Sequence, residues 1–186
     1  MESLKRIQKR LIGITPEVRW LWNDIGNKKY RPCTENEFSD YIKQKLEDDL
    51  VGKGIIVNRE VEIRKGFGNT KGERTDIHIN AIVPRKTGSQ IDSVTVIIEV
   101  KGSWNKDIMS AMQQQLAYRY MKDEKCEYGI YLVGWFEGEN WDNEDPRRKT
   151  AQKLKIEELS ESLDQQAKEL RDKKYNIHSF VINAGL

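Results

Sequence analysis

The feature that most constrains the fold is a change in hydrophobic period about a third of the way along the chain. Up to that point apolar residues recur every three to four positions, as in amphipathic helices. They then alternate over 55–64 and 74–83 and form a nearly unbroken β-branched run over 94–100. Alternation is typical of strands with one buried face, and a continuous run is typical of a central strand covered on both faces. The connections at 66–72 and 84–90 are short and predict a three-strand meander.

Helical patterns precede and follow this meander. Leu4, Ile7 and Leu11 predict a short amphipathic helix, and Thr34 with Glu37 three residues later has the spacing of a helix-starting capping box. Besides the meander, the sequence predicts helices over 3–12, 34–52, 105–122 and 149–173. It also predicts strands over 128–136 and 175–183. The expected fold is an α/β domain with a mixed central sheet, the three-strand meander plus further strands, flanked by helices.

Length and composition narrow the class of protein. A chain of 186 residues favours one domain, and 37% hydrophobic residues with five Trp can build a core. No apolar run approaches the roughly 18 residues that span a bilayer, and the first residues lack the features of a signal peptide. The two cysteines, 93 positions apart, form neither a disulfide framework nor a zinc ligand set. We therefore expect a cytoplasmic protein with no membrane partner.

Charge is unevenly distributed although the formal net charge is only +2. Residues 1–31 hold eight basic and three acidic side chains, so the rest of the chain is mildly acidic. We interpret 1–31 as a basic N-terminal arm or helix and 32–186 as the main domain. A basic arm predicts a polyanionic partner such as DNA, although a solvated helix face explains the same charges equally well.

The residues that carry chemistry lie at the ends of the second and third predicted strands. Glu99 and Lys101 are two positions apart on a strand, so they project from the same face. If these strands pair through the 84–90 loop, Asp76 lies beside Glu99. Carboxylate oxygens are natural ligands of Mg²⁺, which binds through one or two acids plus substrate phosphates. Lys101 could then orient or deprotonate an attacking water, the latter if burial lowers its pKa.

An acid two residues before a lysine is weak evidence by itself. The pattern occurs three times in the chain: Glu99–Lys101, Asp123–Lys125 and Asp172–Lys174. The first instance alone ends an apolar strand with a second acid on a neighbouring strand. A structural salt bridge of Lys101 with Glu99 or Asp76 is the alternative, because half-buried ions must be paired or bind metal.

These residues resemble the PD-(D/E)XK, or restriction-endonuclease-like, nuclease superfamily. Thr75-Asp76 matches the first acid, and Glu99-Val100-Lys101 matches the second acid and the lysine. The order of elements from about residue 34 to 135 is similar to the common core of that superfamily. In the helix after the lysine, Gln114 and Tyr118 match the Gln-x-x-x-Tyr pattern of RecB-type members.

The resemblance implies a deoxyribonuclease that requires Mg²⁺ or Mn²⁺ and acts as an endonuclease, with Asp76, Glu99 and Lys101 as catalytic residues. Asp76, Glu99, the main-chain carbonyl of Val100 and Glu37 on the first core helix would hold the metal. The substrate-binding residues would be Gln114, Tyr118 and Arg74. The chain would be the effector domain of a larger restriction or antiphage-defence protein, or a small enzyme of that kind, and double-strand cutting would favour a homodimer.

Several assignments stay open at this level. Thr75 replaces the proline usually found before the first acid, and Glu35 or Asp40 could serve in place of Glu37. Arg74 could contact a phosphate or pair with a neighbouring glutamate. His78 shares a strand face with Asp76, where an ordinary buried histidine is the simpler interpretation. The rival function is a catalytically inactive nuclease-like fold that binds DNA or assembles with other proteins.

Overall fold

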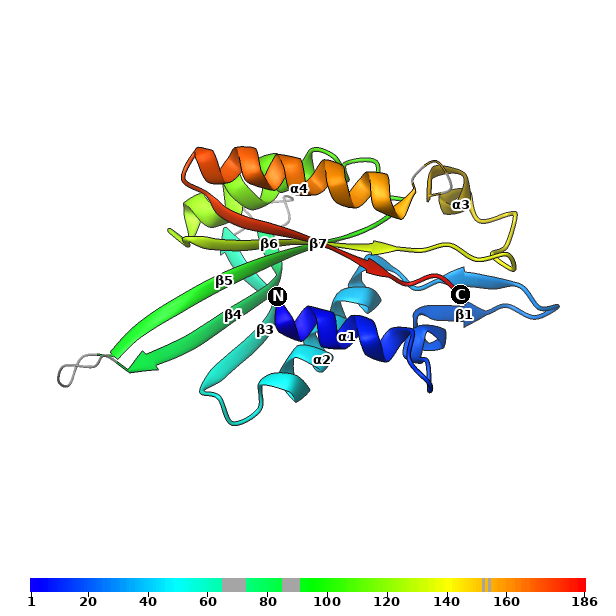
Figure 1. Ribbon diagram of the computed structural model, residues 1–186, viewed down its shortest axis with the longest axis horizontal. Coiled ribbons are helices and arrows are strands. Elements are labelled where there is room, and N and C mark those ends of the chain that lie inside the picture. Colours follow the sequence, from blue (N-terminus) through cyan, green and yellow to red (C-terminus); the bar gives the residue numbers. More distant parts are fainter. Residues whose placement is uncertain (65–72, 85–90, 152, 154) are drawn as a thin grey trace.

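A five-stranded mixed sheet forms the centre of the computed structural model, which describes residues 1–64, 73–84, 91–151, 153 and 155–186 (Figure 1). Its strand order is β3-β4-β5-β6-β7. The first three strands are antiparallel, whereas β5, β6 and β7 run parallel to one another. The strands are β3 (Ile55–Arg64), β4 (Glu73–Pro84), β5 (Ile91–Gly102), β6 (Tyr128–Trp135) and β7 (Asn176–Asn183). The predicted meander and the mixed α/β sheet are therefore confirmed.

Helices cover both faces of the sheet (Figure 1). On one face, α1 (Glu2–Leu11) and α2 (Glu35–Leu50) pack against Ile98 and Leu132 of the central strands. On the other face, the helix η2 (Met112–Met121) and α4 (Ile156–Asp172) pack against Ile97 and Tyr131. Because side chains alternate along a strand, Glu99 and Lys101 share the face of Ile97, beneath η2 and α4.

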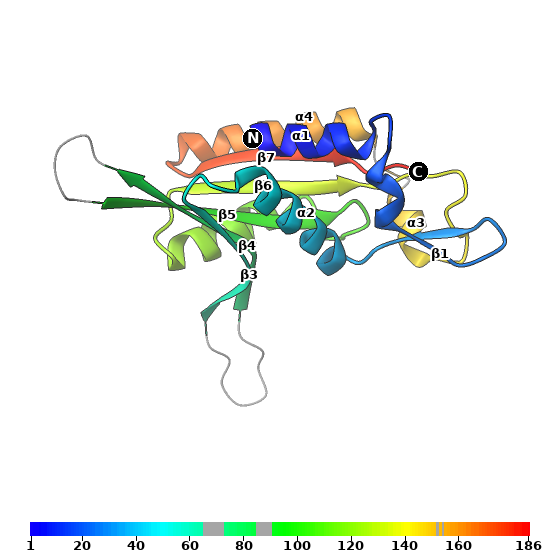
Figure 2. The ribbon, with the colours of Figure 1, turned by 90° about the horizontal axis from the view of Figure 1, so that it is seen from below.

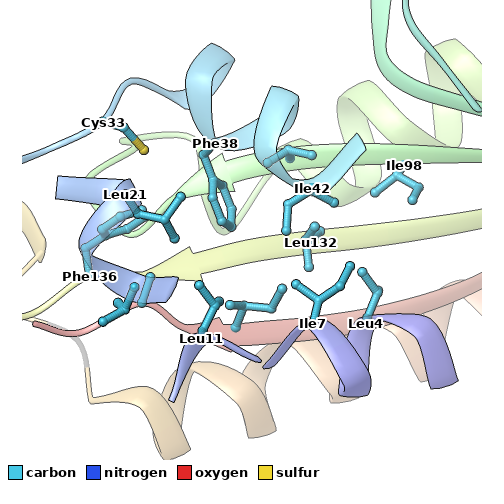
Figure 3. Packing of buried hydrophobic residues seen from close by; sticks show 14 of the residues in the cluster. Leu4, Ile7, Leu11, Leu21, Cys33, Phe38, Ile42, Ile98, Leu132 and Phe136 are labelled. Atoms are coloured by element: carbon cyan, nitrogen blue, oxygen red, sulfur yellow. The ribbon is translucent and has the colours of Figure 1, made fainter. Parts of the chain in front are cut away.

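The N-terminal residues are part of the same core. Leu4, Ile7 and Leu11 of α1 are each at most 2% exposed and point toward the sheet and α2 (Figure 3). Gln8 fastens the helix to the end of β7, because its side chain both donates to the Asn183 carbonyl and accepts from the Asn183 N–H. The basic segment 1–31 is thus packed onto the domain and is not an extended arm.

The sequence patterns missed a small ribbon and a helix break. Strands β1 (Trp22–Asp24) and β2 (Tyr30–Pro32) form a separate antiparallel pair, preceded by the 3-10 helix η1 (Glu17–Leu21). The single helix predicted over 149–173 is wrong: α3 (Pro146–Ala151) and α4 are two helices. Pro146 suits a first helical turn, and the Asp145 carboxylate accepts the N–H of Arg147, so α3 has a start of its own.

The helix predicted over 105–122 takes an unusual form. Its start consists of turns, and Met112–Met121 is a π-helix, in which hydrogen bonds close five residues apart instead of four. The wider turn changes which side chains meet on its surface, with consequences for the site described below.

Strands β4 and β5 extend together beyond the helices as a two-stranded arm (Figure 2). The two strands pair from Pro84↔Ile91 back to Ile77↔Ile98, so Asp76 directly follows this stretch at the end of the arm that the helices cover. In the described part of the chain, no helix is long and apolar enough to cross a membrane.

Candidate active site

The structure brings Asp76, Glu99 and Lys101 together at the junction of β4 and β5, and we refer to this cluster of three side chains as the acidic pocket. Glu99 and Lys101 are 2% and 8% exposed, and Asp76 is partly buried. The Lys101 ammonium donates to Glu99 Oε1 at 2.5 Å. Asp76 Oδ2 accepts the main-chain N–H of Val100, which lies between the other two residues, at 2.8 Å. Two carboxylates and one ammonium therefore converge from adjacent strands.

Burial dominates the electrostatics of the two acids. Burial and then the neighbouring charge of Asp76 raise the pKa of Glu99 to about 8. Burial likewise raises the pKa of Asp76, although Lys101 and the Val100 N–H act against it. Like charges this close do not both ionise readily, so near neutral pH the pair retains one proton.

Lys101 is held in its charged form. Burial alone would lower its pKa, but the charge of Glu99, the hydrogen bond to Glu99 and the charge of Asp76 together raise it. The expectation that burial lowers this pKa far enough for the amine to act as a base is therefore wrong for this arrangement. An ammonium can still orient a water molecule or stabilise negative oxygen atoms.

A third carboxylate approaches the pocket from α2, and it belongs to Glu35. Its Oε1 accepts two hydrogen bonds of 2.8 Å, from the Gly102 N–H and from the Asn105 side chain. Its charge acts on both Asp76 and Lys101. Glu35 thus ties the first turn of α2 to the segment that directly follows Lys101.

Glu37, the residue expected to supply this third acid, points elsewhere. Its carboxylate accepts the Thr34 N–H at 2.7 Å and the Thr34 hydroxyl at 2.9 Å, while Thr34 accepts the Glu37 N–H. The predicted capping box is confirmed. The structure does not bring Glu37 to the acids of β4 and β5, because its side chain is engaged at the helix start.

Gln114 and Tyr118 are not brought to the pocket either. Both are exposed, and Tyr118 accepts a hydrogen bond of 2.8 Å from Gln113, five residues before it. The Tyr118 ring packs against Tyr175 with centroids 5.6 Å apart. An α-helix would place residues four apart on one face, whereas this π-helix pairs residues five apart.

The other predicted contacts have different outcomes. Arg74 belongs to β4 by its backbone, and its side chain lies outside the described part of the structure. His78 is buried beside Asn80, 3.1 Å from its side chain, and its Nε2 is 4.0 Å from Glu124. Thr75, at the position of the usual proline, is fully buried.

Two buried tyrosines also interact with the acids electrostatically or across the sheet. Tyr120 on η2 is 8% exposed, and burial and the charges of Glu99 and Asp76 raise its pKa to about 12. Tyr131 pairs with Glu99 across the strands, and its hydroxyl donates to the Ile108 carbonyl at 2.8 Å. The helical spacing Leu116–Tyr120 could have predicted that Tyr120 faces the sheet, but no sequence signal marks its hydroxyl.

The donor set suits Mg²⁺ or Mn²⁺ better than a tightly caged metal. Among the described residues, no three His, Cys, Asp or Glu side chains gather as a ready metal cage. Mg²⁺ does not need one, because it usually binds through one or two carboxylates, waters and substrate phosphates. When both Asp76 and Glu99 are ionised, the single ammonium leaves a buried negative charge, which a divalent cation would neutralise. Residues of a strand direct their N–H and C=O to the same neighbour, so the Val100 carbonyl is also on the Asp76 side.

Comparison with known proteins identifies a family without describing an activity. Over 106 residues the chain is 24% identical to the 3-phosphoshikimate 1-carboxyvinyltransferase of Methanococcus vannielii, a match that covers 56% of this chain. The chain spans only 23% of the length of that relative. No solved structure matches the chain significantly. The family model described as "Domain of unknown function (DUF8371)" matches residues 9–138, more than half of the chain, and the protein therefore belongs to this family.

Proposed function

We propose that this protein is a divalent-metal-dependent nuclease that hydrolyses phosphodiester bonds of DNA, on a restriction-endonuclease-like core. The observation that carries the proposal is the convergence of Asp76, Glu99 and Lys101 in one largely buried cluster with more acid than base. A structural salt bridge would need one acid for one lysine. A second buried carboxylate without a cation of its own is costly unless it has a ligand to bind.

The residues divide the work between holding a cation and handling the substrate. Asp76, Glu99 and the Val100 carbonyl would hold Mg²⁺ or Mn²⁺, while Glu35 of α2 positions the segment after Lys101 through its hydrogen bonds with Gly102 and Asn105. When bound, the ion supplies positive charge against the phosphate and eases the ionisation of water. The Lys101 ammonium donates hydrogen bonds to the attacking water or to the phosphate oxygens, where charge accumulates in the transition state.

The setting of this activity is part of the same proposal. The protein would act in the cytoplasm as the effector of a restriction or antiphage-defence system, alone, as a homodimer or within a larger protein. A catalytically inactive DNA-binding or assembly module is the second candidate. One observation favours it: the direct Lys101–Glu99 contact already neutralises one of the two acids.

Cleavage assays test the proposal. Wild-type protein and the variants Lys101→Met and Asp76→Asn are incubated with plasmid and linear DNA, with Mg²⁺, with Mn²⁺ and with a chelator. We expect metal-dependent cleavage by the wild type and a loss of about 100-fold or more in Lys101→Met. Lys168→Met and Asp172→Asn, exposed positions on and at the end of α4, are the matched controls and should cleave normally. Equal cleavage by wild type and folded Lys101→Met would end the nuclease assignment.

A further inference from the structure

A second feature of the molecule, away from the acidic pocket, combines an exposed indole with several cations. We call it the Trp20 patch and define it as Arg10, Arg19, Trp20 and Lys45. Trp20 is 70% exposed, although most large apolar side chains of the chain are buried. Arg10 and Arg19 are exposed as well. The patch draws on α1, η1 and α2, three elements that meet beside the sheet.

The indole is presented on a rigid support. Val18 and Leu21, its neighbours in η1, are 7% and 1% exposed and anchor the 3-10 turn in the core. The turn is fastened further by the hydrogen bond from the Cys33 N–H to the Leu21 carbonyl at 2.8 Å. A large ring held on an ordered backbone loses little conformational entropy when a ligand stacks on it.

One cation lies against the ring, and two more basic residues lie on the neighbouring segments. The Lys45 ammonium lies 5.0 Å from the centre of the Trp20 ring and 5.4 Å from that of Tyr41, within cation–π range. Glu17 is the acid of this region, and it is engaged by Lys45 at 2.8 Å and by the Tyr41 hydroxyl at 2.8 Å. The charge of Arg10 also reaches Glu17 and Tyr41. No ion pair joins Arg10 or Arg19 to any residue in the described part of the chain, so the patch has surplus positive charge.

We propose that the Trp20 patch binds a single strand of nucleic acid, with one base stacked on Trp20 and phosphates contacted by Arg10 and Arg19. The inference rests on the proposed function, since it assigns an additional contact to the same class of substrate. Proteins that bind single strands without sequence preference combine aromatic rings, on which bases stack, with basic residues along the backbone of the strand. An apolar protein partner would have to bury the two guanidinium groups without anions, which is costly.

Binding can be measured without cleavage. Fluorescence anisotropy of a labelled oligothymidylate is followed in a chelator for the wild type, Trp20→Ala, Trp20→Phe and the double variant Arg10→Ala/Arg19→Ala. We expect Trp20→Ala to bind roughly 5- to 100-fold more weakly and Trp20→Phe to retain most of the affinity. The double variant should bind more weakly at low salt and reduce the slope of log affinity against log salt by about one.

The controls are an exposed aromatic residue and exposed cations elsewhere. Tyr128→Ala on β6, where the side chain is 39% exposed, and Lys149→Ala/Lys168→Ala on α3 and α4 should bind like the wild type. Wild-type affinity in Trp20→Ala overturns the proposal, as does equal weakening in Trp20→Phe and Trp20→Ala when both melt like the wild type. Patch-dependent binding by a protein that never cleaves DNA would refute the nuclease activity and leave the strand-binding patch supported.

Discussion

At the scale of single residues, the end of β5 is unusual because it buries more charge than it neutralises. Glu99 and Lys101 follow a strand of β-branched residues, and their contact accounts for one acid. Asp76 adds a second acid, which accepts the main-chain N–H of Val100. A buried arrangement of this kind lowers stability unless a proton or a cation is bound. This loss of stability is the reason for expecting that the site binds a cation.

The raised pKa of Glu99 predicts how stability depends on pH in metal-free protein. The unfolded side chain ionises near its ordinary value of 4.5, whereas the folded side chain keeps its proton up to about pH 8. The folded state thus binds the extra proton, so the free energy of unfolding falls as pH rises through this window. Urea denaturation in a chelator at pH 5 to 8 should show this fall in the wild type and a smaller one in Glu99→Gln. A urea midpoint that rises with pH, and rises equally in the wild type and in Glu99→Gln, would contradict this explanation.

Glu35 and Glu37 give a matched pair of substitutions on one helical turn. We expect Glu37→Ala to lower the free energy of unfolding by about 1 kcal/mol through loss of the capping box, with cleavage unchanged. Glu35→Ala should instead reduce metal-dependent cleavage, because its carboxylate holds Gly102 and Asn105 next to Lys101. Denaturation curves and cleavage rates of the two variants distinguish these roles. The reverse result, with cleavage lost in Glu37→Ala, would return the metal site to the residue that the sequence suggested.

At the scale of elements, the site depends on how α2 is attached to the sheet. Arg59 of β3 is largely buried and donates to the Asn36 carbonyl at 2.6 Å and to Asp40 at 3.0 Å. These contacts fix the first turn of α2, which also contains Glu35. The guanidinium therefore connects the start of α2 to β3.

The contribution of Arg59 to stability can be compared with that of an ion pair within α2, the helix that Arg59 contacts. Arg59→Ala should lower the free energy of unfolding by about 2 kcal/mol, since charged hydrogen bonds contribute more than neutral ones. Lys43→Ala, which removes the exposed pair with Glu47, should change it by less than about 0.5 kcal/mol. Urea midpoints measure both. Equal small changes would show that Arg59 does not hold the helix.

The elements also show what a sequence can and cannot predict. Hydrophobic period predicted the meander, strands β6 and β7, and helices α1 and α2, because the alternation of buried and exposed residues follows directly from the geometry of strand and helix. The acids of β4 and β5 could be placed together because strand pairing fixes their register. The choice between Glu35 and Glu37 could not be made, since both suit the first turn and only the capping geometry separates them. Nor could the π-helix be expected, and it moves the partner of Tyr118 from Gln114 to Gln113.

At the scale of the whole molecule, the first helix is part of the domain that holds the site. The charge pattern suggested a division after residue 31, but Ile7 is 2% exposed within the core shared by α1, α2 and the sheet. Each fully buried aliphatic side chain contributes about 1.5–3 kcal/mol. Three of them approach the total stability of a typical domain, which is about 5–15 kcal/mol. Basic residues of this segment are therefore held in fixed positions, as the Trp20 patch requires.

This integration predicts that the fragment 32–186 does not fold alone. In the full chain, Ile7→Ala should lower the free energy of unfolding by about 2–5 kcal/mol, because it leaves a cavity in the core. Ile14→Ala, at a fully exposed position nearby, should be within about 0.5 kcal/mol of the wild type. Circular dichroism of the fragment and urea curves of the two variants check these outcomes. A cooperative transition of the fragment with unchanged midpoint would show that the segment is dispensable.

The most direct test of the account is calorimetric titration of the metal-free protein with Mn²⁺ at pH 7, in buffers of different ionisation enthalpy. We predict saturable binding to the wild type with release of protons, since the cation replaces the proton retained by Asp76 and Glu99. Binding should be abolished in Asp76→Asn and Glu99→Gln and kept in the control Asp172→Asn. Identical heats for the wild type and the pocket variants, or no binding by any of them, would contradict the claim that this pocket exists to hold a divalent cation.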